Sequence, residues 1–206
     1  MSTWVAYYSH HGNNTTLARH LAGRLGCGLL PILELKPRSN LAILWDVLSG
    51  RLPRLQPIEQ TFLEHDRVIL VAPVWAGKLA APMRTFLRLY REQLHDYSFI
   101  TLCGYERPEQ RGWLMEELAR RVGRPARAVS ELRVSDLLPP EQRQSLRVIN
   151  GYHVQEAELQ HYQRAIDDFL RASGVQPAAS ARNVPGAISS GQAAIDGPMG
   201  EQGETP

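Results

Sequence analysis

The chain has 206 residues, 43% of them hydrophobic, which is enough for one domain with a sizeable core. Its 23 basic and 21 acidic side chains give a net charge of +2 without any basic block, which argues against a nucleic-acid-binding protein. No apolar run is long enough to cross a membrane, no signal peptide precedes the first strand-like segment, and two cysteines make no disulfide framework, so a cytoplasmic protein is expected.

The first 25 residues predict a strand, a tight polar loop and a helix. Residues 4–8 form an apolar run typical of a buried strand, and from Leu17 on apolar residues recur at helical steps of three and four. The loop between them, residues 9–14, is polar, and its Gly12 permits a positive φ or a close backbone approach. Because the first turn of a helix leaves its N–H groups unpaired, this layout favours an anion.

Two interpretations of this loop remain open from the residues alone. Either the loop binds a phosphate group, or Asn14 or Thr15 simply caps the helix. The loop lacks the lysine of a GxxxxGKS sequence and has only one of the three glycines of GxGxxG. Because it offers neutral donors without Lys or Arg, a phosphate site here suits a cofactor monophosphate better than a phosphoryl group in transfer.

Strand and helix signals alternate as far as residue 172. Strands are expected at residues 29–35, with Pro31 indicating an edge strand, and at 67–74, 98–103 and 126–134. Helices are expected at residues 39–50, 82–90, 111–122 and 156–172. Residues 135–152 show no clear pattern and fit a lid, a dimer contact or an extra edge. Residues 176–206 have almost no large apolar side chain, so we expect a disordered tail after a single domain, residues 1–175.

This alternation predicts an α/β fold with a parallel sheet covered by helices on both faces. In such sheets, ligands bind at the carboxyl ends of the strands, where the strand order reverses. The loops after the first, third and fourth strands are therefore expected to project from one edge of the sheet. These loops are residues 9–16, 73–81 and 103–108.

With these loops placed, the sequence resembles the flavodoxin family over residues 3–172. The segment Ser9-His10-His11-Gly12-Asn13-Asn14 is similar to the family's Ser/Thr-x-Thr-Gly-Asn-Thr phosphate loop. Residues 73–78 are similar to the segment that carries an aromatic residue against the isoalloxazine ring, and residues 103–105 to the loop that closes over the other ring face. The resemblance implies a flavodoxin-like three-layer sandwich with a five-stranded parallel sheet in the order 2-1-3-4-5 and FMN at its carboxyl edge.

The resemblance also implies a set of cofactor-binding residues. The first loop would meet the FMN phosphate through N–H groups and short side chains, from Ser9, His10, His11, Gly12, Asn13, Asn14 and Thr15. Because Asn14 replaces a threonine of the family pattern, either its amide supplies the missing donor or Thr15 does. The other two loops would meet the ring, through Pro73, Val74, Trp75, Ala76, Gly77, Lys78, Cys103, Gly104 and Tyr105.

Several of the ring-side residues have an ordinary structural alternative. Trp75 either stacks on the flavin, which would add about 0.5–1.5 kcal/mol beyond area burial, or is a core or interface aromatic. Tyr105 either closes over the ring or lies on the surface. Gly77 and Gly104 either let backbone amides approach the ring or only shape turns, and we expect Lys78 to be solvated.

The sulfur and imidazole side chains suggest no separate chemistry. Cys27 and Cys103 are expected to be reduced thiols, and Cys103, at the end of a buried strand, is expected to act as a small hydrophobe rather than a redox group. His10 and His11 are not expected to bind a metal, because no matching cluster of ligands exists elsewhere in the chain. No residue stands out as catalytic.

The expected function is that of an FMN-dependent oxidoreductase that passes electrons from NAD(P)H, or from a protein donor, to a quinone-like, other small-molecule or protein acceptor. The alternative is a flavodoxin-type electron-transfer protein without a substrate of its own, and a third possibility is a module of this fold that has lost its cofactor. The tail holds one arginine and three acidic residues, which leaves +4 on the body and favours the enzyme over an acidic carrier. The sequence leaves the oligomeric state open.

Overall fold

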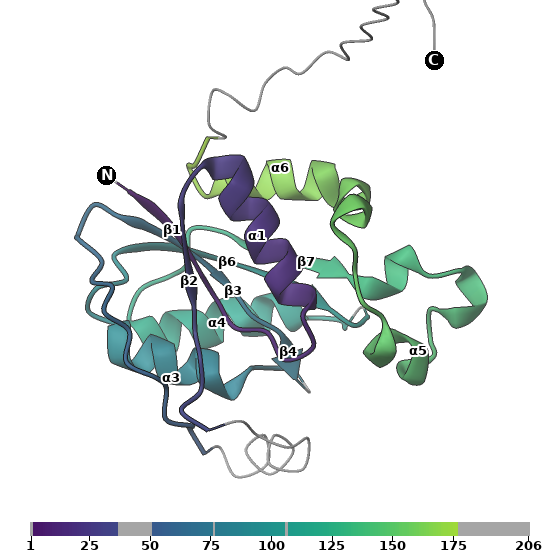
Figure 1. Ribbon diagram of the computed structural model, residues 1–206, viewed down its shortest axis with the longest axis horizontal. Coiled ribbons are helices and arrows are strands. Elements are labelled where there is room, and N and C mark those ends of the chain that lie inside the picture. Colours follow the sequence, from purple (N-terminus) through teal and green to yellow (C-terminus); the bar gives the residue numbers. More distant parts are fainter. Residues whose placement is uncertain (1, 37–50, 76, 106, 177–206) are drawn as a thin grey trace, which may run out of the picture.

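Parallel strands form the central sheet of the computed structural model, which describes residues 2–36, 51–75, 77–105 and 107–176 (Figure 1). The five strands lie in the order β2-β1-β3-β6-β7, which confirms the predicted order 2-1-3-4-5. Every pairing in this sheet is parallel, and Val5, for example, lies opposite Leu29 on one side and Ile69 on the other. The strands are β1 (Thr3–Tyr7), β2 (Gly28–Pro31), β3 (Arg67–Val71), β6 (Asp96–Cys103) and β7 (Val129–Arg133).

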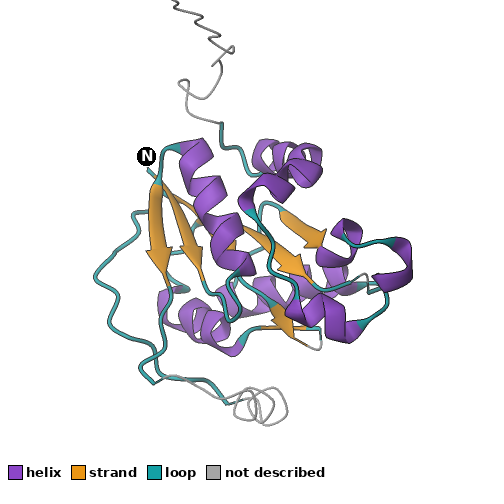
Figure 2. Ribbon diagram, turned by 45° about the vertical axis from the view of Figure 1, so that its right-hand side comes forward, coloured by secondary structure: helices purple, strands orange, loops and turns teal. Residues whose placement is uncertain are grey.

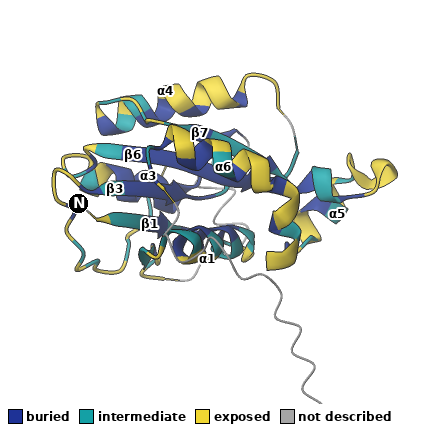
Figure 3. Cartoon of the chain, turned by 90° about the horizontal axis from the view of Figure 1, so that it is seen from above, coloured by how far each residue is buried: buried dark blue, intermediate teal, exposed yellow. Residues whose placement is uncertain are grey.

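Helices cover both faces of the sheet and complete a three-layer sandwich (Figure 2, Figure 3). In β3, Ile69 and Val71 belong to one apolar core, whereas Val68 and Leu70 belong to the other. Side chains alternate between the two faces of a strand, so a strand covered on both faces has to be apolar throughout. The first core is shared with α1 (Asn13–Leu25) and α6 (Gln163–Ala172), and the second with α3 (Ala81–Tyr90) and α4 (Gln110–Val122).

Three of the predicted strands are shorter than expected: β7 begins at Val129 rather than at residue 126, and the other two end at or near a proline. The edge strand β2 stops at Pro31 rather than at residue 35, and β3 stops at Val71, two residues before Pro73. Proline has no N–H to donate, so the ladder of the central strand β3 does not continue through Pro73. Beside the edge strand β2, the N–H of Ile32, just after Pro31, still donates to the carbonyl oxygen of Tyr7 at 2.7 Å. After Pro73 the chain instead forms an antiparallel hairpin that the sequence did not predict, made of β4 (Val74–Trp75) and β5 (Lys78–Leu79).

The prediction of a single α-helix over residues 156–172 is wrong. The first part, η3 (Glu156–Tyr162), is a 3₁₀ helix, and α6 follows it. The buried side chains of η3, Leu159 and Tyr162, are three residues apart, which is the repeat of a 3₁₀ helix. In α6, by contrast, the buried side chains recur with α-helical spacing, at Ile166, Phe169 and Leu170.

The segment after β7, for which the sequence gives no clear pattern, forms three short helical pieces and no strand. They are η1 (Val134–Leu137), η2 (Pro140–Gln142) and α5 (Leu146–Gly151). Leu138 and Ile149 are buried in the same core as α1 and α6, and they hold this segment at the end of the sheet (Figure 1).

Some expectations lie outside the described residues, namely the helix over residues 39–50 and the disordered tail beyond Gln176. Among the helices that the structure describes, none combines the length and the apolar composition needed to span a membrane.

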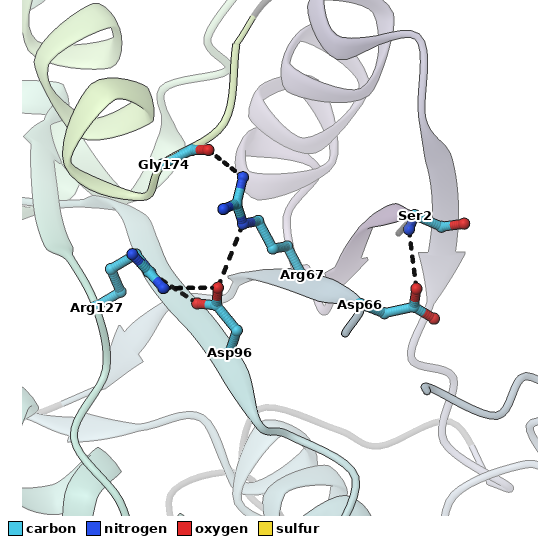
Figure 4. A network of polar contacts seen from close by, with 6 residues as sticks. All are labelled: Ser2, Asp66, Arg67, Asp96, Arg127 and Gly174. Carbon is cyan, nitrogen blue, oxygen red and sulfur yellow. Dashed lines mark hydrogen bonds and ion pairs between the residues drawn. The ribbon is translucent and has the colours of Figure 1, made fainter. Parts of the chain in front are cut away.

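Polar contacts tie several elements together at the amino ends of β3 and β6 (Figure 4). The carboxylate of Asp96 lies between two guanidinium groups: Arg127 donates to it from Nε at 2.8 Å and from Nη2 at 2.9 Å, and Arg67 donates from Nε at 3.3 Å. Arg67 also donates to the carbonyl oxygen of Gly174, just after α6. The network therefore joins β3 and β6 to the end of the last helix.

Replacing Asp96 with asparagine is expected to lower the free energy of unfolding by about 1 kcal/mol, since a bidentate contact is lost but the groups are partly exposed. The loss should shrink at high salt, which screens the ion pairs in the unchanged protein. Urea unfolding of both proteins at low and high salt measures this loss of unfolding free energy. Asp168→Asn is the control, because Asp168 pairs with Arg171 on an exposed helix face and its loss should change stability by less than ~0.5 kcal/mol. Equal effects of the two substitutions would contradict a structural role for the network.

Candidate functional site

A pocket opens at the carboxyl edge of the sheet, where the loops after β1, β3 and β6 meet. Its enclosed volume is about 120 Å³. The three loops singled out by the sequence contribute these lining residues: Ser9, His10, His11, Asn13, Asn14, Pro73, Val74, Trp75, Cys103 and Gly104. The structure therefore brings the three loops to one place, while the binding of FMN there stays a prediction.

The loop after β1 turns at Gly12 and leads directly into α1. Gly12 has a φ of 92°, in the left-handed region that favours glycine. Its carbonyl oxygen accepts hydrogen bonds from the N–H groups of Thr15 at 2.8 Å and Thr16 at 3.0 Å, and its own N–H donates to Ser9 Oγ at 3.1 Å. Because α1 begins at Asn13 behind this turn, without a side-chain cap, the interpretation of Asn14 or Thr15 as the helix cap is wrong.

Backbone N–H groups at this turn point to an anion site. Within the part of the chain that the structure describes, the N–H groups of His11, Asn13 and Asn14 have no acceptor. They belong to the loop and to the first turn of a 13-residue helix, whose dipole favours negative charge at this end. Unpaired N–H groups at a helix N-terminus suit a phosphate or a carboxylate.

The side chains of Asn13 and Asn14 fix the start of α1 to two other segments. Asn14 is 3% exposed, and its amide donates to the carbonyl oxygen of Leu102 at 3.2 Å and accepts from the N–H of Leu102 at 3.0 Å. Asn13 in the same way donates to the carbonyl oxygen of Tyr152 at 2.8 Å and accepts from the N–H of Val154 at 2.9 Å. Both amides therefore hold the start of α1 through paired backbone contacts, while the choice of Asn14 or Thr15 as the phosphate donor in place of the family's threonine stays a prediction.

Trp75 is half-buried and borders the pocket. Its ring lies edge to face against two aromatic rings, with centroids 5.9 Å from Tyr8 and 6.1 Å from His10. Its neighbours Pro73 and Val74 line the same pocket. The indole is thus held in place by the loop after β1, and part of it stays exposed next to that loop.

Gly77 and Lys78, also predicted in the second loop, do not line this pocket. The hairpin carries Gly77 and Lys78 to a different hollow, beside α4. Gly77 has a φ of 77°, and a Cβ added to it would come within 2.3 Å of the Trp113 ring. Its glycine is therefore explained by the turn and by close packing on Trp113, and Ala76 lies outside the described residues.

The third loop divides between two pockets. Cys103 and Gly104 line the first pocket, and a Cβ on Gly104 would lie 3.0 Å from Cγ2 of Ile149. Burial raises the pKa of the Cys103 thiol to about 12, which makes it a neutral, buried group as expected for a small hydrophobe. Tyr105 turns into the neighbouring pocket, where Arg107 donates from Nη2 to its hydroxyl oxygen at 2.9 Å.

Two imidazoles, of His10 and His11, line the pocket at the anion site. The ring centroids of His10 and His11 are 4.3 Å apart. Burial, and after it the charges of His10 and His153, lower the pKa of His11, which favours the neutral form of this imidazole. No group of three His, Cys, Asp or Glu side chains in the described ranges could hold a metal ion.

Four residues that the sequence did not single out also line the pocket. They are Leu102, Val134, Ile149 and Asn150. Leu102 and Val134 lie at the ends of predicted strands, so the rule that ligands bind at strand ends could have found them. Ile149 and Asn150 belong to α5, in a segment without a readable pattern, and no sequence signal pointed to them.

Comparisons with known proteins agree with this architecture. No protein-family profile matches the sequence, and no curated protein is similar to it in sequence. Among solved structures, the chain is similar to a flavoprotein from Lactobacillus acidophilus in complex with FMN, at 16% identity and a TM-score of 0.55 over 63% of this chain and 92% of that one. It is also similar to a protein described as a flavoprotein from Bacteroides eggerthii, at 15% identity and a TM-score of 0.57 over 85% and 99% of the two chains. The structure and these similarities together show that the chain has the flavodoxin-like α/β fold.

Proposed function

We propose that this protein binds FMN in the pocket at the carboxyl edge of its sheet and uses it for electron transfer. The observation that supports the proposal most is the convergence in one pocket of an anion site, at the start of α1, and an indole ring, at the end of the loop after β3. The similarity to a flavoprotein in complex with FMN adds to it.

The residues present fit a phosphate monoester. The N–H groups of His11, Asn13 and Asn14 would hold it, and the hydroxyl groups of Ser9 and Thr15 lie in the same turn. No lysine or arginine lines the pocket within the described residues, so the helix dipole and neutral donors would carry the negative charge. The Asn13 and Asn14 side chains hold the turn in place, which lowers the ordering cost of binding.

The ring of FMN would lie on the open side of the pocket. The enclosed volume of about 120 Å³ is below the roughly 300 Å³ of the smallest pockets that hold cofactor-sized ligands, so the ring would extend to the rim that Trp75 borders. Cys103, as a neutral thiol, and Gly104, without a side chain, would give the ring an apolar wall and a close backbone. Trp75 would pack against the ring and exclude water from one side of it.

The chemistry belongs to the cofactor, which accepts and releases electrons singly or in pairs when bound. We propose that the protein is an NAD(P)H-dependent oxidoreductase with a quinone-like or other acceptor. The second candidate is an electron carrier of the flavodoxin type, which would transfer electrons between protein partners. The charge of +4 on the body favours the enzyme, because a positive surface attracts the anionic nicotinamide dinucleotides.

Adding FMN to the purified full chain tests the first step, with quenching of flavin fluorescence as the measurement. Oxidation of NADPH or NADH by the FMN-loaded protein in the presence of a quinone tests the second. A stable one-electron form on reductive titration, without turnover, would support the carrier instead. A protein that does not take up FMN at all would be a module of this fold without its cofactor.

Replacing Trp75 with alanine is expected to weaken FMN binding about tenfold or more, because the ring loses both buried area and an aromatic contact. The control is Trp113→Ala, which removes an indole that is 49% exposed and lies outside the pocket. This second variant should bind FMN as tightly as the unchanged protein. If Trp75→Ala lowers stability and leaves FMN affinity unchanged, Trp75 is a packing residue and the proposed ring position is wrong.

A further inference from the structure

A second pocket lies beside the first one and is not used by the proposed FMN site. It has a volume of about 590 Å³, within the roughly 300–1,000 Å³ of pockets that bind small organic molecules. Tyr105, Arg133 and Leu146 line it, together with polar residues of η1 and of the turn before α5. A pocket of this size next to a cofactor site is a candidate site for a second ligand.

The same three segments line both pockets and lie between them. The loop after β6 gives Gly104 to the first pocket and Tyr105 to the second. The end of β7 and the start of η1 give Val134 to the first pocket and Arg133 with Ser135 to the second. In α5, Ile149 lines the first pocket, and Leu146, one helical turn earlier, lines the second. A ligand in the second pocket would therefore lie against the same three segments that bound the first.

The lining of the second pocket combines positive charge with apolar surface. Arg133 and Arg143 bring two guanidinium groups, and among the lining residues that the structure describes Asp136 is the one with a carboxylate. Arg143 donates from Nε to the carbonyl oxygen of Leu138 at 2.9 Å, which fixes the orientation of its guanidinium group. Arginine presents a planar fork that suits a carboxylate, a sulfonate or a phosphate.

The apolar part comes from an aromatic ring and an exposed aliphatic side chain. The Tyr105 ring is held by Arg107, whose Cζ lies 5.4 Å from the ring centroid. Leu146 is 55% exposed and offers the pocket an aliphatic surface next to the Tyr105 ring. A small planar molecule with one anionic group would meet both kinds of surface at once.

We infer that this second pocket binds a planar aromatic molecule that carries a carboxylate, and that this molecule is the second ligand of the proposed FMN site. The inference rests on the proposed function for the second ligand's role, but the binding itself does not require FMN. Arg133 and Arg143 hold the carboxylate, and Tyr105 and Leu146 contact the ring.

Calorimetric titration of the full chain, saturated with FMN, with 2-naphthoate and with 2-naphthamide tests the inference. The two compounds have the same ring system, and only the first is an anion. Naphthoate is expected to bind at least about tenfold more tightly, and the difference should disappear in the double variant Arg133→Gln, Arg143→Gln. The control is Arg164→Gln, Arg171→Gln, which removes two positive charges from α6 outside the pocket and should leave both affinities unchanged.

Two further measurements separate the parts of the inference. Leu146→Asn should weaken naphthoate and naphthamide equally, because it removes an apolar contact that both make. Inorganic phosphate should displace naphthoate only at concentrations far above those of naphthoate itself. Equal affinity for the two compounds, insensitivity to the Arg133 and Arg143 substitutions, or displacement by phosphate at equal concentration would each overturn the inference.

The same titration without FMN distinguishes this inference from the proposed function. If the protein fails to quench flavin fluorescence but binds naphthoate through Arg133 and Arg143, the proposed function fails and the second pocket stands. If the protein binds FMN but has equal affinity for naphthoate and naphthamide, the inference about the second pocket is wrong and the proposed function stands. Trp75→Ala, which changes only the first pocket, should leave naphthoate binding unaltered.

Discussion

Replacing Asn14 with aspartate is expected to lower the free energy of unfolding by about 2–4 kcal/mol at pH 7. The buried amide now donates to the carbonyl oxygen of Leu102 and accepts from its N–H. Aspartate keeps an acceptor for the N–H but places a second oxygen against the carbonyl, so one hydrogen bond is replaced by a repulsive contact and a charge is buried. Urea unfolding monitored by circular dichroism measures the loss.

The pH dependence of this variant gives the prediction a second, independent readout. Burial beside a carbonyl raises the pKa of the introduced carboxyl group in the folded state, since the protonated form can donate to Leu102. A group with a raised folded-state pKa contributes stability that is present below its unfolded pKa and is lost as the pH rises through its folded pKa. The difference between the variant and the unchanged protein should therefore be smallest near pH 4 and largest near neutrality.

Asn13→Asp is the matched control. Asn13 precedes Asn14 on the first turn of α1 and is half-buried rather than buried. Its amide also donates to one backbone carbonyl oxygen and accepts from one backbone N–H, those of Tyr152 and Val154. Both substitutions add the same charge at the same helix end, so the contribution of the dipole cancels between them. Asn13→Asp should cost about 1 kcal/mol and vary less with pH. If the two variants lose equal stability, the burial of the Asn14 amide is not what makes it important.

Replacing Gly104 with leucine is expected to weaken FMN binding by about a hundredfold or more. Gly104 lines the first pocket, and a Cβ at this position would already lie 3.0 Å from Cγ2 of Ile149. A four-carbon side chain in an enclosed volume of about 120 Å³ leaves little room for any part of a cofactor. Flavin fluorescence quenching gives the affinity, and thermal unfolding gives the accompanying loss of stability.

Two companion variants make this result interpretable. Gly112→Leu places the same side chain on α4, where a Cβ meets nothing within 4 Å, and it should bind FMN normally with equal or slightly higher stability. Adding Ile149→Ala to Gly104→Leu relieves the contact between the two side chains. If the double variant recovers stability and also binds FMN with the original affinity, then Gly104→Leu acts through misfolding of α5 and not through the pocket.

The elements that the sequence predicts well are those with local signals. The run from Arg67 to Val71 is apolar at every position after the first, and this identifies a central strand without any knowledge of its neighbours. The polar turn at Gly12 follows the first strand directly, and parallel strands send such turns to the same edge. The strand order and the meeting of the three loops follow from these signals together with the family resemblance.

The residues that the sequence placed less well depend on contacts between distant segments. The role of Asn14 is set by a strand 88 residues away, and a single asparagine in a loop does not reveal that partner. Tyr105 follows Gly104 directly but lines a different pocket, in a bend after the end of β6 whose course no local pattern predicts. Gly77 looks like a position for backbone approach to a ring, and only the packing of Trp113 shows another reason for it.

The network around Asp96 has a consequence for how this protein tolerates change. All strands of the sheet run the same way, so the amino ends of β3 and β6, with Arg67 and Asp96, lie on the side of the molecule opposite the two pockets. Substitutions that strengthen that side do not touch the groups that hold a ligand. Thermostability and ligand preference can therefore be engineered in separate halves of one small domain, and losses incurred by remodelling a pocket can be offset from the far end.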